Sequence, residues 1–136
     1  MIPEIYVRDC LSALDFYKHV FGGEIKNLRM SDDLELFRGV TGKVIHAELH
    51  VNARCVFYFV DLMDSQRAHP GNVALMLHLD NEREMRRVYR ELSAAGRVSM
   101  KLQQNFWGDY HAIVTDRFGA LWALNSAAKN QHVKQV

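Results

Sequence analysis

The chain runs through the same order of elements twice, and this repeat limits its fold more than any other feature. The first half predicts a strand, a helix that begins at Asp9 and ends at Gly22-Gly23, and strands over 24–30, 44–51 and 55–60. The second half predicts a strand over 73–79, a helix capped by Asp80 or Asn81 and ended by Gly96, and strands over 98–102, 110–115 and 120–125. Asp9 and Asp80 stand 71 positions apart. Few residues are identical between the halves, so the repeat is one of pattern.

Each half has one helix with a single apolar stripe, which can cover only one face of its strands. The stripes recur at spacings of three and four, at Leu11, Leu14, Tyr17, Val20 and Phe21, and at Met85, Val88, Tyr89, Leu92 and Ala95. A sheet this small does not bury its apolar residues alone. The pattern therefore predicts an α+β protein of two βαβββ modules, with sheets that close on each other or on a second chain.

Charge and hydropathy exclude several classes of function. There are 17 basic and 16 acidic residues, which leaves a net charge of +1 and favours no nucleic-acid partner. No apolar run is long enough for a membrane span, and the first ten residues lack the apolar core of a signal peptide. We expect a cytoplasmic protein that does not bind membranes, with Cys10 and Cys55 as reduced thiols.

Three stretches resemble the vicinal oxygen chelate superfamily (glyoxalase, bleomycin resistance, dioxygenase), and its PhnB-like branch in particular. They are ALDFYKHVFGGEI at 13–25, VIHAELHV at 44–51 and FWGDYHAIVTDRFGALWALN at 106–125. The resemblance implies a curved mixed sheet around a cavity, with helices on the outer face. It also implies one domain over 1–128, made of module one (1–62), a linker (63–72) and module two (73–126), before a polar tail (127–136).

The resemblance also raises two chemical questions. Members of this branch often carry a methyltransferase label, which we disfavour because the chain has no glycine-rich strand-to-helix turn for a nucleotide-like cofactor. The family's metal ligands map near Ile2, Ala74 and Ala123, and within the apolar strand 55–60, and none of these offers a ligand group. We therefore predict no metal and no cofactor, with a divalent ion as the less favoured alternative.

The strand 44–51 carries the strongest candidate chemistry. His46, Glu48 and His50 alternate and must share one face, with neighbours about 6.5 to 7 Å apart at Cα and the two histidines about 13 Å apart. Three interpretations stay open. Glu48 hydrogen-bonds one histidine in a polar wall, two of the three bind a metal with help from Asp109 or His111, or His46 and Glu48 act as an acid/base pair.

Besides the acid/base candidates His46 and Glu48, five residues are candidates for ligand binding. They are His50, Phe57, Trp107, Tyr110 and His111. Trp107 and Tyr110 could stack on a flat ligand, although Trp107 could equally plug the end of the sheet. Phe57 joins the site only if its face of the strand 55–60 points toward the cavity, and the sequence does not fix that register.

These observations favour a metal-free small-molecule-binding protein. The alternative is a lyase, isomerase or dioxygenase that uses His46 and Glu48, with or without a metal, and a third possibility is a protein-interaction module. Because modules of this kind commonly close across two chains, we also expect a homodimer, with or without exchanged modules.

Overall fold

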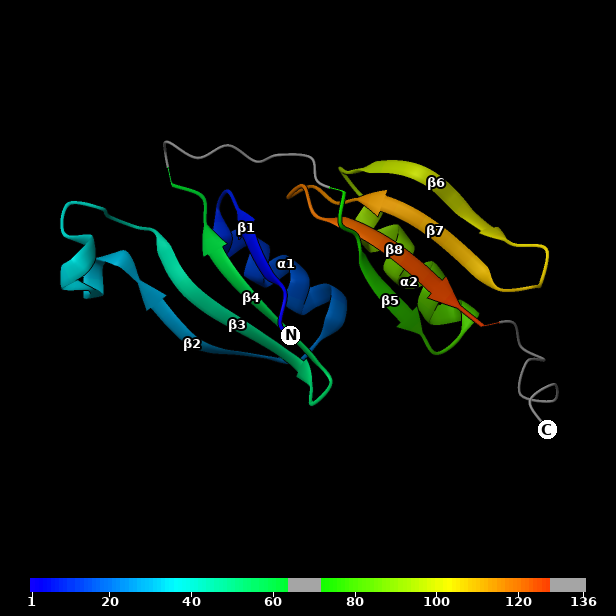
Figure 1. Ribbon diagram of the computed structural model, residues 1–136, viewed down its shortest axis with the longest axis horizontal. Coiled ribbons are helices and arrows are strands. Elements are labelled where there is room, and N and C mark those ends of the chain that lie inside the picture. Colours follow the sequence, from blue (N-terminus) through cyan, green and yellow to red (C-terminus); the bar gives the residue numbers. More distant parts are fainter. Residues whose placement is uncertain (64–71, 128–136) are drawn as a thin grey trace. The chain divides into compact units, whose positions relative to one another are not determined.

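The computed structural model describes residues 1–63 and 72–127, which form two compact units. The first unit contains β1 (Glu4–Val7), α1 (Cys10–Phe21), β2 (Glu24–Met30), β3 (Val44–Asn52) and β4 (Cys55–Asp61), with short 3₁₀ helices at Ser31–Asp33 and Glu35–Phe37. The second contains β5 (Leu75–Leu79), α2 (Glu82–Ser93), β6 (Arg97–Gln104), β7 (Tyr110–Thr115) and β8 (Leu121–Ser126). Figure 1 shows each unit as a sheet with one helix.

The two units share one topology. The strand orders are β1-β4-β3-β2 and β5-β8-β7-β6, and in each sheet the first strand pairs in parallel with the last. The other neighbours are antiparallel, so both sheets are mixed. This confirms the predicted pair of βαβββ modules. Most of the linker and most of the tail lie outside the described residues, and the single domain over 1–128 stays a prediction.

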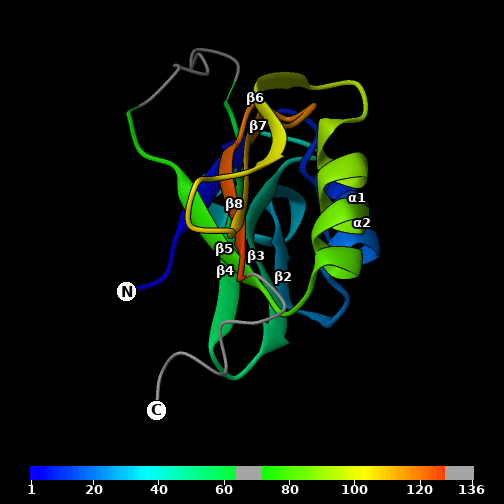
Figure 2. The same ribbon diagram turned by 90° about the vertical axis from the view of Figure 1, so that its right-hand side faces the viewer.

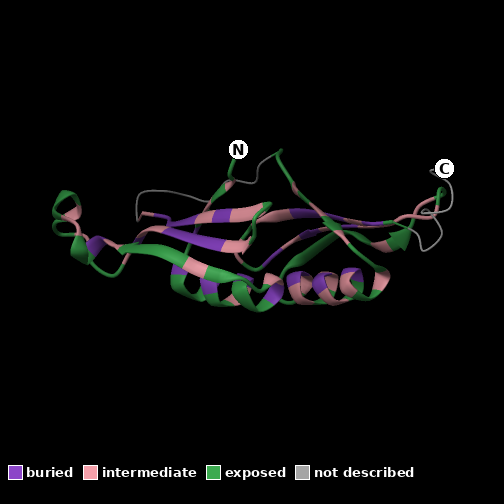
Figure 3. Ribbon diagram, turned by 90° about the horizontal axis from the view of Figure 1, so that it is seen from below, coloured by how far each residue is buried: buried purple, intermediate pink, exposed green. Residues whose placement is uncertain are grey.

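Helix α1 covers one face of the first sheet (Figure 2). Asp9 begins the helix as predicted, because its carboxylate accepts a hydrogen bond from the Ser12 backbone nitrogen. The ring of Tyr17 is fully buried and stacks on Phe59 and Phe21 at centroid distances of 5.2 and 6.2 Å. Buried positions recur along both helices (Figure 3), as the stripes predict for Leu14, Tyr17 and Val20 and for Met85, Val88 and Leu92. Two members of the predicted stripes are wrong, because Leu11 is 47 % exposed and Ala95 lies beyond the end of α2.

Helix α2 differs from the prediction at its end. Asn81 is the capping residue, and the helix ends at Ser93, so the assignment of Gly96 as its terminator is wrong. Ala95 takes the left-handed conformation after the helix, with φ 58°. Gly96 is needed for a different reason, since a Cβ there would lie 2.3 Å from the Thr115 carbonyl oxygen on β7.

The last residue of the fourth strand of each module occupies a matching position. Asp61 pairs with Val7 at the end of β1, and Ser126 pairs with Leu79 at the end of β5. Asp61 is buried and accepts hydrogen bonds from the backbone nitrogens of Cys10 (2.8 Å) and Val44 (2.7 Å). Ser126 is also buried, but its hydroxyl has no hydrogen-bond partner within the described residues.

No helix within residues 1–63 and 72–127 is long and apolar enough to cross a membrane.

Candidate functional site

The two faces of the first sheet are chemically different. Phe57 and Phe59 on β4 lie against α1, and their register partners Leu49 and Ala47 on β3 are completely buried. His46, Glu48 and His50 alternate with these residues and so lie on the opposite face. The prediction that the three share a face is confirmed, and we call the side of the first sheet opposite α1 the polar face.

Glu48 lies at the centre of a hydrogen-bonded cluster on the polar face. His46 Nε2 is 2.7 Å from Glu48 Oε2, and His50 Nε2 is 2.7 Å from Glu48 Oε1. A third donor, Asn27 Nδ2, lies 3.1 Å from Oε1. Glu48 therefore engages both histidines, where the sequence suggested one. We call His46, Glu48 and His50 the His–Glu–His cluster.

These contacts fix the charge of the carboxyl group and the tautomers of both rings. Hydrogen bonds from His46 and His50 lower the pKa of Glu48 to about 2, against the opposing effect of desolvation, with a further contribution from Asn27. An ionised carboxylate only accepts hydrogen bonds, so each neutral imidazole must place its proton on Nε2. Nδ1 of each ring is then left with a lone pair, and each histidine side chain is about one-third exposed.

The surroundings of the cluster combine aromatic and polar groups. The ring of Tyr58, the register partner of Glu48, meets the His46 ring edge-on at 4.7 Å. His50 lines an open hollow of about 480 Å³ together with Lys26, Asn52 and Val56. Glu24 also lines this hollow, and its carboxylate lies 3.8 Å from the Lys26 ammonium, so the polar face presents one imidazole and one ion pair to the same space.

Phe57 does not belong to this site. It lies on the α1 side of β4, only 4 % exposed, with its ring centroid 5.8 Å from that of Phe21. The condition under which we expected it to bind a ligand is not met, so we withdraw it from the candidate residues. The alternation along β4 brings Tyr58, which the sequence argument did not select, to the polar face instead.

The other three candidates lie in the second unit, and two of them, Tyr110 and His111, lie on opposite faces of β7. Tyr110 precedes the buried Ala112 and Val114 on the α2 side, and the Arg86 guanidinium lies 5.9 Å above its ring. His111 lies on the other side of β7, in register with Asn125. The structure therefore does not bring Tyr110 and His111 together.

Trp107 lies in the loop between β6 and β7. It is 57 % exposed, its ring meets Phe106 edge-on at 4.4 Å, and its indole nitrogen donates to Asp109 at 3.2 Å. With this exposure, Trp107 does not plug the end of its own sheet. Its role in ligand binding stays a prediction.

Asn27 is the residue of the cluster that the sequence analysis missed. It lies on β2 with φ 54°, in the left-handed region, at an irregularity of the ladder between Lys26 and Arg29. An asparagine in a strand carries no signal for such a bulge, because the bulge depends on pairing with β3.

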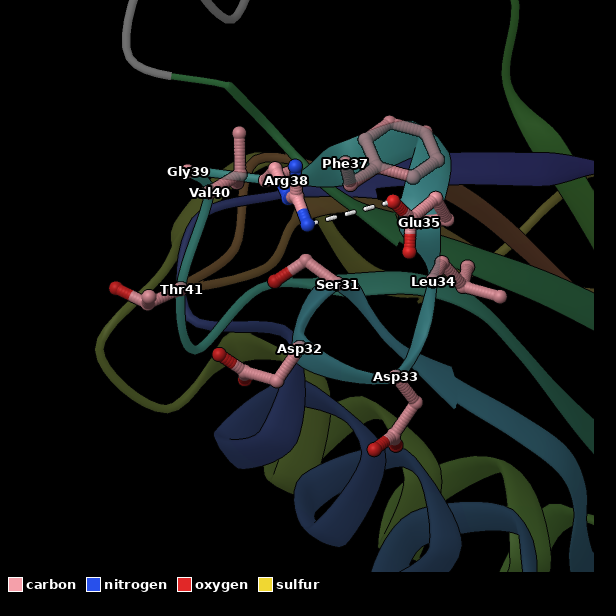
Figure 4. Close-up of a pocket in the computed structure, with 10 residues that line it drawn as sticks. All are labelled: Ser31, Asp32, Asp33, Leu34, Glu35, Phe37, Arg38, Gly39, Val40 and Thr41. Atoms are coloured by element: carbon pink, nitrogen blue, oxygen red, sulfur yellow. Dashed lines mark ion pairs between the residues drawn. The ribbon is translucent and has the colours of Figure 1, made fainter.

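A second hollow, of about 300 Å³, lies within the loop between β2 and β3 (Figure 4). Its polar groups hold the loop itself, since Asp32 accepts from the Gly42 backbone nitrogen at 2.9 Å and Arg38 lies 3.6 Å from Glu35. None of the predicted site residues lines this hollow. Across residues 1–63 and 72–127, no three His, Cys, Asp or Glu side chains are grouped so that they could hold a metal ion.

Comparisons with known proteins agree with the architecture. Protein PA1353 from Pseudomonas aeruginosa superposes with a TM-score of 0.85 over 95 % of this chain and 98 % of its own, at 24 % identity. A Bacillus cereus PhnB protein, described as a putative 3-demethylubiquinone-9 3-methyltransferase, superposes with a TM-score of 0.78 over 93 % of this chain and 98 % of its own, at 23 % identity.

The sequence comparisons identify the family. The uncharacterized protein Mb0911c of Mycobacterium bovis is 29 % identical, over 98 % of this chain and 87 % of the relative. The model of the Glyoxalase/Bleomycin resistance protein/Dioxygenase superfamily matches residues 3–124. With this match over nearly its whole length, the chain belongs to the glyoxalase/bleomycin resistance protein/dioxygenase superfamily.

Proposed function

We propose that the protein binds a small molecule, without a metal, in the hollow beside the His–Glu–His cluster. The observation that carries the proposal is the fixed geometry of the cluster at the wall of that hollow. Glu48 orients both imidazoles before any ligand arrives, and His50 lines a space of about 480 Å³. Small-molecule sites commonly have volumes of a few hundred Å³ and a few oriented polar groups.

The hollow also suggests what the ligand must offer. Nδ1 of His50 would accept a hydrogen bond from an N–H or O–H group, while Lys26 and Glu24, which form an ion pair of 3.8 Å within the lining, would offer a donor and an acceptor with little net charge. Val56 contributes apolar surface. A small polar compound with a short apolar part fits these groups best.

Two features support binding without a metal. Nε2 of each histidine and the Glu48 oxygens already satisfy one another, so the cluster could offer a metal only its two Nδ1 lone pairs, fewer than the three or four ligands that a divalent ion normally requires. The family's ligand positions near Ile2, Ala74 and Ala123 carry no donor group. Elemental analysis of protein purified without chelator tests this part, and a stoichiometric transition metal would refute it.

The binding proposal is tested by a thermal-shift screen of metabolites and antibiotics, followed by calorimetric titration of each stabilising compound. His50→Ala should weaken binding about tenfold, as expected for one lost ligand hydrogen bond. His19→Ala is the matched control, because His19 is an exposed histidine on α1. The proposal fails if no compound stabilises the protein, or if every compound binds His50→Ala as tightly as the wild type.

An enzymatic role is the second candidate, and the pairing of His46 with Glu48 favours it. A carboxylate that holds Nε2–H leaves Nδ1 as a base of fixed orientation, which suits a lyase, isomerase or dioxygenase. Mass spectrometry of each compound after incubation with the protein distinguishes the two roles. Turnover that is lost in Glu48→Gln while binding is kept would favour the enzyme.

We also propose that the chain forms a homodimer, with or without exchanged modules. The proposal rests on the small size of each four-stranded sheet, which has only one helix to cover it. Size-exclusion chromatography with light scattering should give twice the chain mass at micromolar concentration. A monomer at that concentration would count against it.

A further inference from the structure

We infer that Asn27 is a positioning residue, which uses a local break in β2 to hold the Glu48 carboxylate between the two histidines. The inference rests on the proposed function of the His–Glu–His cluster, and it concerns how that cluster is kept in place. Nothing in the sequence marks Asn27, and its role follows from the strand register and one hydrogen bond.

The register shows that the break is local. From Lys26 to Arg29, β2 advances three positions while β3 advances only two, from Glu48 to His46. At the next pair, Met30 with Val44, β2 advances one position and β3 advances two. The extra residue is thus compensated at once, and the strand returns to its original alignment. The bulge therefore leaves the pairing on either side of it unchanged.

The bulge changes which side chain reaches Glu48. Lys26 pairs with Glu48 and so shares its face. In an unbroken strand the next residue, Asn27, would point to the α1 side, and Leu28 would return to the polar face. Instead Asn27 takes φ 54° and its amide nitrogen lies 3.1 Å from Glu48 Oε1. The break thus brings a hydrogen-bond donor to the polar face, where a regular strand would place Leu28 opposite His46 and only Lys26 opposite Glu48.

The chemistry of the contact is directional. An ionised carboxylate cannot donate, so the asparagine must turn its NH₂ group toward it. Oε1 then receives two donors, Asn27 and His50, while Oε2 receives His46. Donors on both oxygens restrain rotation of the carboxylate about its last bond. Asparagine also tolerates the left-handed conformation better than most residues, so it can meet both demands.

The test uses the ligand-free full chain, labelled for NMR, and compares Asn27→Gly with the wild type. Glycine accepts the same backbone conformation but removes the donor. The carboxyl carbon of Glu48 should titrate about half a pH unit higher, a threefold change in its acid dissociation constant. Imidazole two-bond ¹H–¹⁵N spectra of His46 and His50 should show a smaller share of the Nε2–H tautomer.

Two further variants separate positioning from general damage. Asn27→Asp keeps the size but sets a second carboxylate against Glu48, so it should raise the Glu48 pKa more than Asn27→Gly does. Ala95→Gly relieves the same backbone conformation, with φ 58°, at a position in the second unit and should leave both readouts unchanged. Lys26 and Tyr58 flank Glu48 in register and are retained in every variant.

The outcomes distinguish this inference from the proposed function. If Asn27→Gly folds and leaves the Glu48 titration and both imidazole spectra unchanged, the inference is refuted, even if ligands bind through His50. If the spectra change as expected while no compound binds, the inference stands and the proposed function fails.

Discussion

Replacing Glu48 with glutamine should flip the tautomer of one histidine and leave the other unchanged. A carboxylate offers two accepting oxygens, whereas a glutamine amide offers one oxygen and one NH₂ group. Oε1 of Glu48 receives two donors, from Asn27 and His50, and Oε2 receives one, from His46. The amide oxygen should therefore take the Oε1 position, which turns the NH₂ group toward His46.

His46 must then accept at Nε2 and move its proton to Nδ1, while His50 keeps its proton on Nε2. The opposite amide orientation would lose the Asn27 hydrogen bond unless the Asn27 amide also turned over, and one bond of average net strength gives a preference of roughly fivefold. We expect the flipped form of His46 to dominate by about that factor.

Two-bond ¹H–¹⁵N spectra measure both tautomers directly, at a pH where the rings are neutral. His111 in the second unit serves as the internal reference and should not change. If neither ring changes, the donor and acceptor roles assigned to the cluster are wrong. If His50 flips instead of His46, the place given to Asn27 is wrong.

Three further predictions concern stability and can be read by urea unfolding. Asp61→Ala leaves two buried backbone nitrogens without an acceptor and should lower the free energy of unfolding by about 3 kcal/mol. Asp15→Ala, on the exposed side of α1, is the control and should change the free energy of unfolding little. A loss below about 1 kcal/mol in Asp61→Ala would contradict the role given to this carboxylate. Gly96→Ala forces a Cβ to within 2.3 Å of a β7 carbonyl and should cost about 2 kcal/mol, so an unchanged unfolding midpoint would exclude the close approach. The pKa of Glu48 is lowered to about 2 in the folded chain, from an ordinary value of 4.5. Between these two pH values the unfolded chain binds more protons than the folded chain, so wild-type stability should fall as the pH drops from about 4.5 to about 2. Glu48→Gln should lose less stability over that window, and equal losses would contradict the pKa.

The sequence predicted each module well because its signals are local. The cap at Asp9, the helical stripes and the strict alternation of β3 each depend on a few neighbouring residues, and the structure confirms them apart from Leu11 and Ala95 at the ends of the stripes. The errors arose where distant segments decide. Gly96 was taken for a helix terminator, although the approach of β7 explains it. The sequence does not reveal which face of β4 carries Phe57. Only the packing of Phe57 against Phe21 on α1 shows the side of the sheet on which it lies.

The site was predicted in part for the same reason. One strand brings His46, Glu48 and His50 to a common face, so alternation alone was enough. Asn27 reaches the cluster from another strand and through a bulge, which no local pattern encodes.

The matching positions of Asp61 and Ser126 bear on how the two units open. In the first unit a carboxylate ties the end of β4 to the first residue of α1 and to the start of β3. At the corresponding place in the second unit lies the hydroxyl of Ser126, which has no hydrogen-bond partner among the described residues. Each unit packs its own helix on its own sheet, and cooperative units of this kind can open in separate steps. The amides of Cys10 and Val44 should then exchange with solvent deuterium only when the whole first unit opens. We therefore expect the first unit to stay protected from exchange for longer than the second.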